Sequence, residues 1–266
     1  MARRLGYTIA IASFCLTSMN TTISAQTTQD DKLPQAEALL QKMIKAAGGE
    51  KVIRSHNHQT LTGTFSVPAQ GLMGSLSIYS AAPNLQTLHL EIENIGELLN
   101  GYDGKTAWSV HPMNGPDVLE GAQREGAVIQ ADYYATINYK KNYDSIEVVG
   151  KTEFGGKDCY ELKLVTPEGV ESSTFIDASS YLVIGSIRTV ETPQGELEVT
   201  TVSSEYKEFD GEMIATKSEQ DFGGFMQQTI TFEEVSFEAF DHAIFEYPES
   251  IKKLVEKEGA ASQPDD

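Results

Sequence analysis

Short segments of alternating apolar and polar residues run from Tyr143 to Phe237, separated by turn residues at fairly regular intervals. In one segment Leu162 and Leu164 flank Lys163, and this period of two gives a strand one apolar face and one hydrated face. The connections are Phe154–Lys157, Thr166–Gly169, Asp177–Ser180, Thr192–Gly195, Phe209–Glu212 and Asp221–Gly224. All but Asp177–Ser180 contain the Gly or Pro that tight turns favour. The pattern predicts an antiparallel β-meander that twists and curls towards a barrel.

Strand-like segments also precede this meander. We expect strands over Thr60–Val67, Ser75–Ser80 and Thr87–Glu93, each with apolar residues on one side. The segment Asn100–Trp108 reads as a hairpin, because the Asp103-Gly104 pair at its centre is a strong hairpin signal. The chain therefore contains a second, shorter group of strands before the meander.

Two segments carry helical spacing. The first is a helix opened by Pro34 and ended by Gly48-Gly49. The second spans Pro116 to about Ile137, where an apolar stripe recurs and Asp117 lies near the start, favourable to the helix dipole. A helix inserted between two groups of strands must cross the sheet or cap an open end, so we interpret it as a lid.

The ends of the chain differ in composition from its body. Residues 1–25 resemble a signal peptide, since Arg3 and Arg4 precede an uncharged stretch that ends in small residues at Ala25. A retained membrane anchor is the less favoured reading, because a span needs about 20 apolar residues. Residues 26–256 show no linker or repeat and are expected to form one domain, and residues 257–266 are expected to be a disordered acidic tail.

Charge and cysteine content narrow the possible partners. The chain has 20 Lys and Arg against 39 Asp and Glu, a formal net charge of −19 at pH 7. This excess of negative charge disfavours nucleic acid and anionic membrane surfaces as binding partners. Of the cysteines, Cys15 lies in the predicted signal peptide, so Cys159 has no partner for an intrachain disulfide after export.

The order of these elements from about Leu33 to Tyr247 resembles the LolA/LolB-like periplasmic lipoprotein-carrier superfamily. The features that carry the resemblance are the leading helix that ends in Gly48-Gly49, the strand Leu61–Val67, Gly74–Tyr79 followed by Ala82-Pro83, the hairpin Gly101–Trp108, and the helix inserted after it. The resemblance implies a mainly β (α+β) fold, an incomplete antiparallel β-barrel of roughly eleven strands with helices plugging the mouth. It also implies a protein that carries the acyl chains of lipoproteins through the periplasm. We expect the protein to be a monomer.

One departure from the family pattern affects the functional expectation. Carriers of the LolA type place an arginine shortly after the proline that matches Pro83, where it helps hold the lid. Here Leu85-Gln86-Thr87 contains no arginine. The resemblance therefore supports the fold more strongly than a role in lipoprotein trafficking.

An incomplete barrel leaves a concavity that an apolar ligand can enter, with about 0.8 kcal/mol gained for each buried methylene. The predicted apolar liners are Leu61, Phe65, Leu76, Ile78, Leu88, Leu90, Trp108, Leu119 and Ile129. These residues could instead simply pack the core. The first hypothesis is a carrier or sensor of lipid or lipoprotein acyl chains, and the alternative is a cell-envelope interaction module that uses the sheet edge or the lid helix without a lipid.

No catalytic or metal-binding motif in the sequence supports a different function more strongly. His56 and His58 are spaced as two ligands on a strand, but no third ligand follows at a recognisable spacing. No Gly-x-Ser-x-Gly elbow, P-loop or dinucleotide-binding pattern occurs. Cys159 lies in a predicted strand, and we expect its thiol to be buried and inert. We expect the carboxylates of Glu233 and Glu234 to be hydrated on the outer face of the sheet. We therefore expect no enzyme, no cofactor and no metal.

Overall fold

Thirteen antiparallel strands form a single sheet in the computed structural model, which describes residues 33–192 and 195–261. Their order across the sheet is β6-β5-β4-β3-β2-β1-β13-β12-β11-β10-β9-β8-β7. The strands are β1 (His58–Val67), β2 (Leu72–Ala81), β3 (Leu85–Ile92), β4 (Gly96–Tyr102), β5 (Ala107–His111), β6 (Gly115–Val118), β7 (Ser145–Phe154), β8 (Lys157–Val165), β9 (Glu171–Asp177), β10 (Val183–Thr192), β11 (Gly195–Phe209), β12 (Glu212–Phe222) and β13 (Met226–Ser236).

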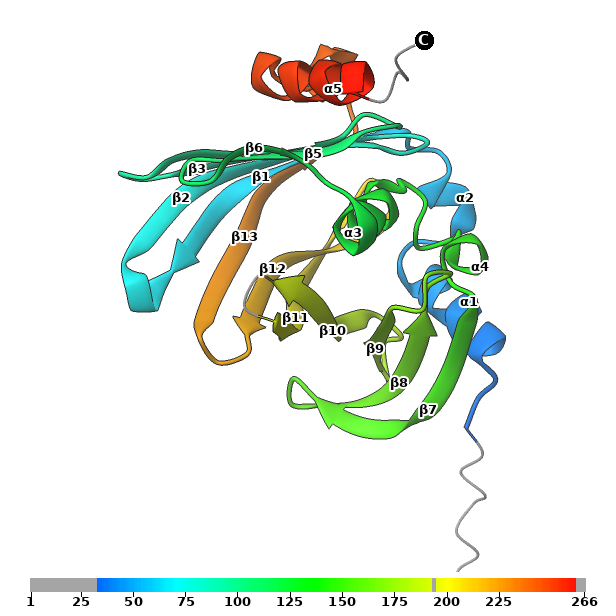
Figure 1. The fold of residues 1–266 in the computed structure, drawn as a ribbon. Helices are drawn as coiled ribbons and strands as arrows, with labels where there is room; N and C mark the ends of the chain where they lie inside the picture. The colour runs from blue at the N-terminus through cyan, green and yellow to red at the C-terminus, as the bar shows by residue number, and fades with distance from the viewer. Residues whose placement is uncertain (1–32, 193–194, 262–266) are drawn as a thin grey trace, which may run out of the picture. The chain divides into compact units, whose positions relative to one another are not determined.

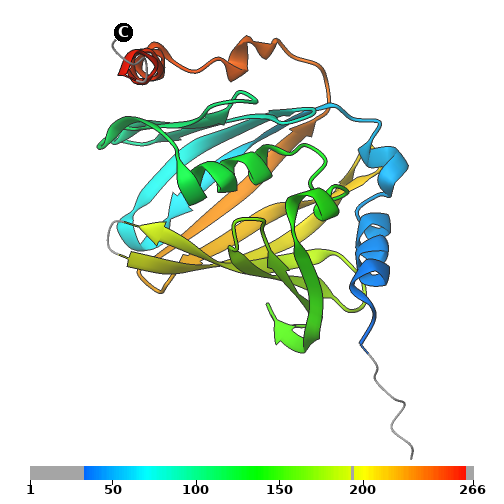
Figure 2. The same ribbon diagram turned by 45° about the vertical axis from the view of Figure 1, so that its right-hand side comes forward.

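The helices lie at the ends of the strands and on both faces of the sheet. They are α1 (Ala36–Ala46), α2 (Glu50–Ile53), α3 (Gly121–Ala131), α4 (Tyr139–Asn142) and α5 (Glu249–Ala261), with short 3-10 helices η1 (Pro68–Gln70) and η2 (His242–Phe245). Figures 1 and 2 show the sheet curling, with β1–β6 and β13 on one side, β7–β12 on the other, and α3 between them. The edge strands β6 and β7 do not pair with each other, so the described strands form an incomplete barrel.

The predicted meander is confirmed as β7–β13, and β1–β5 lie where the earlier strands and the hairpin were expected. The strand count is thirteen rather than about eleven. One strand that the sequence did not predict is β6, which pairs with β5 and places Pro116 opposite Val110. A proline is tolerated there because β6 is an edge strand.

The lid helix is shorter than predicted. It begins at Gly121 rather than near Pro116, because residues 115–118 belong to β6, and it ends at Ala131 rather than near Ile137. Beyond its end, Asp132 accepts hydrogen bonds from the backbone N–H of Tyr134 and from the side-chain amides of Asn138 and Asn142. This buried acid turns the chain away from the helix and fixes the start of α4.

The C-terminal helix α5 was not predicted. Figures 1 and 2 show α5 and η2 on the face of β3–β6 opposite α3, and Ile251 of α5 is fully buried. Residues 257–261 continue this helix instead of forming the expected unstructured tail. Residues 262–266 and the predicted signal peptide, residues 1–25, lie outside the described part of the chain.

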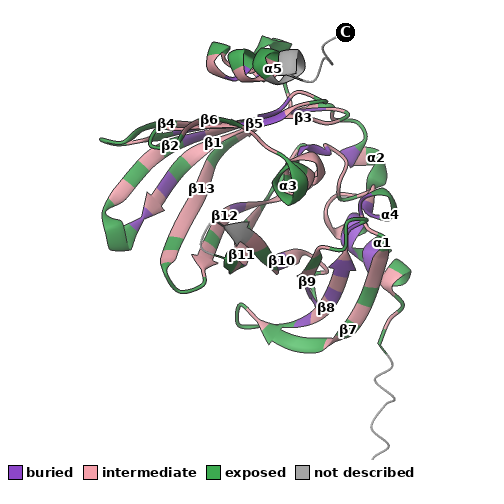
Figure 3. Cartoon of the chain, viewed as in Figure 1, coloured by how far each residue is buried: buried purple, intermediate pink, exposed green. Residues whose placement is uncertain are grey.

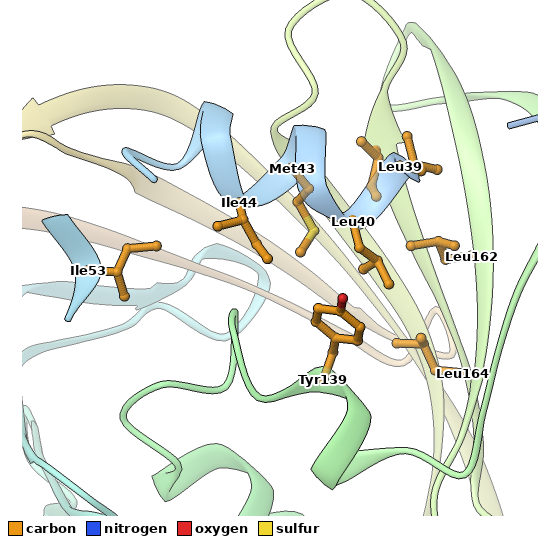
Figure 4. Packing of buried hydrophobic residues seen from close by; sticks show 9 residues of the cluster. Leu39, Leu40, Met43, Ile44, Ile53, Tyr139, Leu162 and Leu164 are labelled. Atoms are coloured by element: carbon orange, nitrogen blue, oxygen red, sulfur yellow. The ribbon is translucent and has the colours of Figure 1, made fainter. Parts of the chain in front are cut away.

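The main hydrophobic cluster lies where α1 packs on β8 and β9. Leu39, Leu40, Met43 and Ile44 share one face of α1 and pack with strand residues such as Leu162 (Figure 4). Burial of each such side chain stabilises the fold by about 1.5–3 kcal/mol. Figure 3 shows buried residues gathered here, whereas α3 is largely exposed or half-buried.

The turn after α1 fixes how that helix meets the sheet. Gly48 has φ of 122°, and a Cβ at this position would lie 2.4 Å from the carbonyl oxygen of Gly211. The backbone N–H of Met213 donates to the carbonyl of Ala47. Glycine is required here because the β11–β12 turn approaches the end of α1 too closely for any side chain.

Candidate ligand-binding cavity

A cavity of about 950 Å³ lies between α3 and the strands on both sides of the sheet. Its lining comes from β3–β5 on one side, from β9–β11 and the β8–β9 turn on the other, and from the segment Leu119–Gln130 that contains α3. This volume is at the upper end of the range that small-molecule sites usually occupy, about 300–1,000 Å³. The cavity is therefore large enough for a ligand of drug or lipid size.

Strand register identifies which side chains of β1–β5 face α3. Tyr102 and Ala107 lie opposite each other and pack with Ala131 of α3. Gln86 lies opposite Tyr102, so Gln86 and Leu88 also point to the inner face, and both line the cavity. The faces of all neighbouring strands follow from this register, because directly paired residues point the same way.

The inner face of β1–β4 and β13 is apolar, and we call its side chains the apolar wall. Buried members pack with partly buried ones: Phe65, Val67, Leu76 and Leu90 with Leu72, Ile78, Leu88, Ile92, Leu98, Met226, Ile230 and Phe232. Leu88 belongs to this wall and also lines the cavity. The apolar wall therefore begins at the cavity and extends from it across the sheet.

The opposite side of the cavity is polar. Ser172 on β9, Ser186 and Arg188 on β10, and Thr201 on β11 all line it. Their register places them on one face, because Ser186 pairs with both Thr174 and Thr201, and Arg188 pairs with Ser172. We call Ser172, Ser186, Arg188 and Thr201 the polar wall.

The polar wall exists because the apolar residues of β9 and β10 point the other way. Phe175 and Ile187 alternate with the polar wall and pack in a separate cluster with Cys159 and Phe154, whose ring stacks on that of Phe175 with centroids 3.9 Å apart. Cys159 is fully buried, and burial raises the pKa of its thiol. The outer face of this half therefore carries its own small core.

Arg188 is the basic residue of the cavity lining. The residue is exposed, and partial desolvation by the surrounding chain lowers the pKa of its guanidinium. Its side chain is accessible from the cavity, yet it has no hydrogen-bond or ion-pair partner among the described residues. Since an arginine has an ordinary pKa above 12, it stays charged here. The cavity thus contains an uncompensated positive charge.

Glu125 on α3 is an acidic residue of the cavity lining. Both of its carboxylate oxygens are buried and have no hydrogen-bond partner by distance and angle within the described chain. Burial raises the pKa of this carboxyl, and so does Glu168 in the β8–β9 turn, whereas nearby Thr166 lowers it. The carboxyl of Glu125 therefore lies against this turn with a pKa above its ordinary value.

The C-terminal end of α3 is firmly attached to the sheet. The hydroxyl of Tyr133 donates to the carbonyl of His58, and that of Tyr134 donates to the carbonyl of His56. The side-chain amide of Gln86 also donates to the carbonyl of Gln130 near the helix end. Any movement of α3 over the cavity would therefore pivot at this end.

The predicted liners divide into two groups. Leu88, Trp108, Leu119 and Ile129 border the cavity. The others belong to the apolar wall or lie beside it: Phe65, Leu76, Leu90 and Ile78 in the wall, and Leu61 opposite Ile78 on the same face. Their contact with a ligand stays a prediction. The polar wall was not predicted, because only apolar side chains were expected to face inward.

Trp108 occupies a different position from the one expected. It pairs with Gly101, and a Cβ on Gly101 would lie 2.4 Å from the Trp108 ring. Gly101 in turn pairs with Thr87, whose hydroxyl donates to the carbonyl of Ile244 in η2. The indole therefore lies on the outer face, on the side that η2 covers, and Trp108 borders the cavity only through its strand.

The histidines form pairs rather than a metal centre. His56 Nδ1 lies 2.7 Å from a Glu212 carboxylate oxygen, and His58 Nε2 lies 2.8 Å from His242 Nε2. No cluster of three or more His, Cys, Asp or Glu suited to a metal occurs in residues 33–192 and 195–261. Within the same residues, no helix has the length and hydrophobicity needed to cross a membrane.

Comparison with known proteins identifies the fold. No family model matches the chain, and no curated protein matches it significantly. Among solved structures, a LolA superfamily protein from Nitrosomonas europaea is similar with a TM-score of 0.56 and 14% identity, over 81% of this chain and 99% of that one. A DUF1329 family protein from Desulfovibrio piger is similar with a TM-score of 0.52 and 11% identity, over 79% and 99%.

A third similar structure is a putative outer membrane lipoprotein-sorting protein domain from Vibrio parahaemolyticus. Its TM-score is 0.51 at 11% identity, and the match covers 82% of this chain and 97% of that one. The chain thus has a LolA-like fold, as the resemblance predicted. Structural similarity at such low sequence identity establishes the arrangement of the backbone but not the ligand. The ligand has to be argued from the cavity.

Proposed function

We propose that this chain, which has a LolA-like fold, binds lipid or lipoprotein acyl chains as a carrier or sensor in the periplasm, without catalysis. The observation that carries the proposal is the cavity of about 950 Å³ beneath α3, which is continuous through Leu88 with the apolar wall. Export rests on the signal peptide predicted over residues 1–25. The fold relationship to a lipoprotein-sorting domain is consistent with this role.

Burial of an acyl chain would provide enough free energy for useful binding. A chain of about fifteen methylenes gains about 12 kcal/mol when it is fully transferred from water. Association entropy removes about 4 kcal/mol or more of this gain. The remainder, about 8 kcal/mol at most, corresponds to a dissociation constant in the micromolar range, which suits a protein that must both bind and release its ligand.

The proposal is tested by filling the cavity from its lid. Gly126 on α3 lines the cavity, and a Cβ added there meets nothing within 4 Å. Gly126→Trp therefore adds a large side chain at the cavity lining without a steric clash with the core. We expect titration with a fluorescent fatty acid to show binding to the wild type and at least a tenfold loss in this variant.

Arg124→Trp is the matched control. Arg124 is exposed on the same helix, lies outside the cavity lining, and makes one hydrogen bond to the carbonyl of Lys105. We expect this variant to bind the fatty acid as the wild type does. Equal affinity of Gly126→Trp and Arg124→Trp would contradict binding beneath α3.

A second candidate function is an interaction module of the cell envelope. Met73, Ile95, Met113 and Phe225 are exposed, and they lie at or beside the β1–β2, β3–β4, β5–β6 and β12–β13 turns. The antiparallel order of the strands places these four turns at one end of the sheet. Exposed apolar residues gathered in this way favour contact with another surface. Absence of any acyl-lipid binding by the wild type would favour this alternative.

A further inference from the structure

The cavity has two walls of opposite character, and this restricts the kind of ligand that it can hold. The apolar wall covers the inner face of β1–β4 and β13, whereas the polar wall on β9–β11 contains hydroxyl groups and one guanidinium. A ligand that is apolar throughout would leave the polar wall without hydrogen-bond partners, which is costly once water is displaced. The arrangement therefore favours an amphiphile.

The charge of Arg188 indicates the sign of the polar end. Arg188 is exposed, lines the cavity and has no carboxylate partner among the described residues, so its guanidinium is available to an anionic group that enters the cavity. Arginine presents a planar set of N–H donors that matches the two oxygens of a carboxylate or phosphate. Ser172, directly opposite Arg188, adds a hydroxyl within reach of the same group.

The acidic residues near the cavity do not neutralise Arg188. Glu171 forms an ion pair with Lys163 at 2.7 Å. Glu125 has a raised pKa and lies beside Glu168, on the side of the β8–β9 turn. Glu196 is exposed at the cavity margin. No carboxylate among the described residues hydrogen-bonds to Arg188 or forms an ion pair with it.

We infer that the cavity selects amphiphiles with an anionic head group, a carboxylate or a phosphate, which Arg188 binds while the acyl chain lies along the apolar wall. This inference rests on the proposed function and adds the chemical class of the ligand to it. Ser172, Ser186 and Thr201 provide the remaining donors to the head group. Arg188 is a binding residue and has no role in holding the fold.

The test compares ligands that differ only in the head group. Hexadecanoate, hexadecyl phosphate and hexadecanol are offered to the exported protein, and affinities are measured by displacement of a fluorescent fatty acid at pH 7.5. The wild type is expected to bind at least one of the two anions about tenfold more tightly than the alcohol. The ratio between the two anions shows which head group the polar wall prefers.

Two variants test whether Arg188 is the source of the preference for anionic head groups. Arg188→Met keeps the length of the side chain and removes its charge, so we expect the preference for anions to fall to about one while the affinity for hexadecanol is unchanged. Arg124→Met removes an exposed arginine of α3 outside the cavity lining and is expected to keep the wild-type preference. A preference that survives in Arg188→Met would overturn the assignment of Arg188.

Thermal unfolding shows whether Arg188→Met changes the stability of the fold. Because the free protein holds Arg188 without a counter-charge, we expect Arg188→Met to unfold at the same temperature as the wild type or a higher one. A marked decrease in the melting temperature would contradict the inference, since it would assign Arg188 a structural role. Equal wild-type affinity for all three ligands would overturn the inference and leave the proposed function standing, whereas no binding of any ligand would overturn both.

Discussion

Glu125→Gln tests how the lid helix is held over the cavity. In the native protein the Glu125 carboxylate is buried without a hydrogen-bond partner and lies beside Glu168, and both conditions raise its pKa. Glutamine has nearly the same shape, carries no charge and can donate hydrogen bonds to Thr166 or Glu168. We therefore expect the substitution to stabilise the protein at neutral pH.

The size of the effect follows from the burial of the carboxylate. A buried polar group without a partner costs about 1–3 kcal/mol, and Glu125 is only half-buried as a residue, so the lower end applies. A gain of about 1 kcal/mol corresponds to an increase in melting temperature of about 2–4 °C for a chain of this size. The shift is large enough to measure by circular dichroism.

The pH dependence has a definite sign. A carboxyl whose pKa is raised in the folded state binds its proton more tightly there than in the unfolded chain, so Glu125 costs least stability at low pH. This cost appears as the pH rises from the ordinary glutamate value of 4.5 through the raised folded value. We expect the advantage of Glu125→Gln to be present at pH 7.5 and to disappear near pH 4.

A matched control removes the same charge elsewhere. Glu233 is exposed on β13, so Glu233→Gln reports the general effect of lowering a formal net charge of −19. Only the difference between the two variants measures the site. Equal melting temperatures of Glu125→Gln and Glu233→Gln at pH 7.5, or a lower one for Glu125→Gln, would refute the reasoning.

Two further predictions concern the packing of α1. Leu39 is fully buried in the main hydrophobic cluster, so Leu39→Ala should reduce the free energy of unfolding by about 2–5 kcal/mol in urea titration; a loss below about 1 kcal/mol would contradict this packing. Gly48→Ala forces a Cβ to within 2.4 Å of the Gly211 carbonyl and adopts an unfavourable φ, so it should destabilise the fold, whereas Gly49→Ala, which meets no atom within 4 Å, should cost less in the same assay. Equal losses in the two glycine variants would show that the close approach to Gly211 is unimportant.

The meander was predictable because its signals are local. Alternation with period two and Gly- or Pro-containing turns are properties of a few consecutive residues, and they located β7–β13. The short strand β6 and the helix α5 were missed, since both depend on distant partners. Pro116 is in a strand because Val110 lies beside it, and Ile251 is buried because α5 packs on the sheet.

The candidate site was only partly predictable, for a related reason. Alternation shows which residues share a face of a strand, but it does not show which face points inward. On β10 the apolar residue Ile187 packs outside, so the polar alternates Ser186 and Arg188 face the cavity. Trp108 was predicted to line the cavity, yet its register with Gly101 places it on the outer face.

Native mass spectrometry of residues 26–266, isolated from a periplasmic extract without detergent, tests the central claim most directly. We predict a mass shift from a bound molecule, which organic extraction releases as an acyl lipid, and loss of that shift in Gly126→Trp but not in Arg124→Trp. A protein that shows only its own mass, and still shows only its own mass after acyl lipids are added, would contradict a lipid-binding cavity beneath α3.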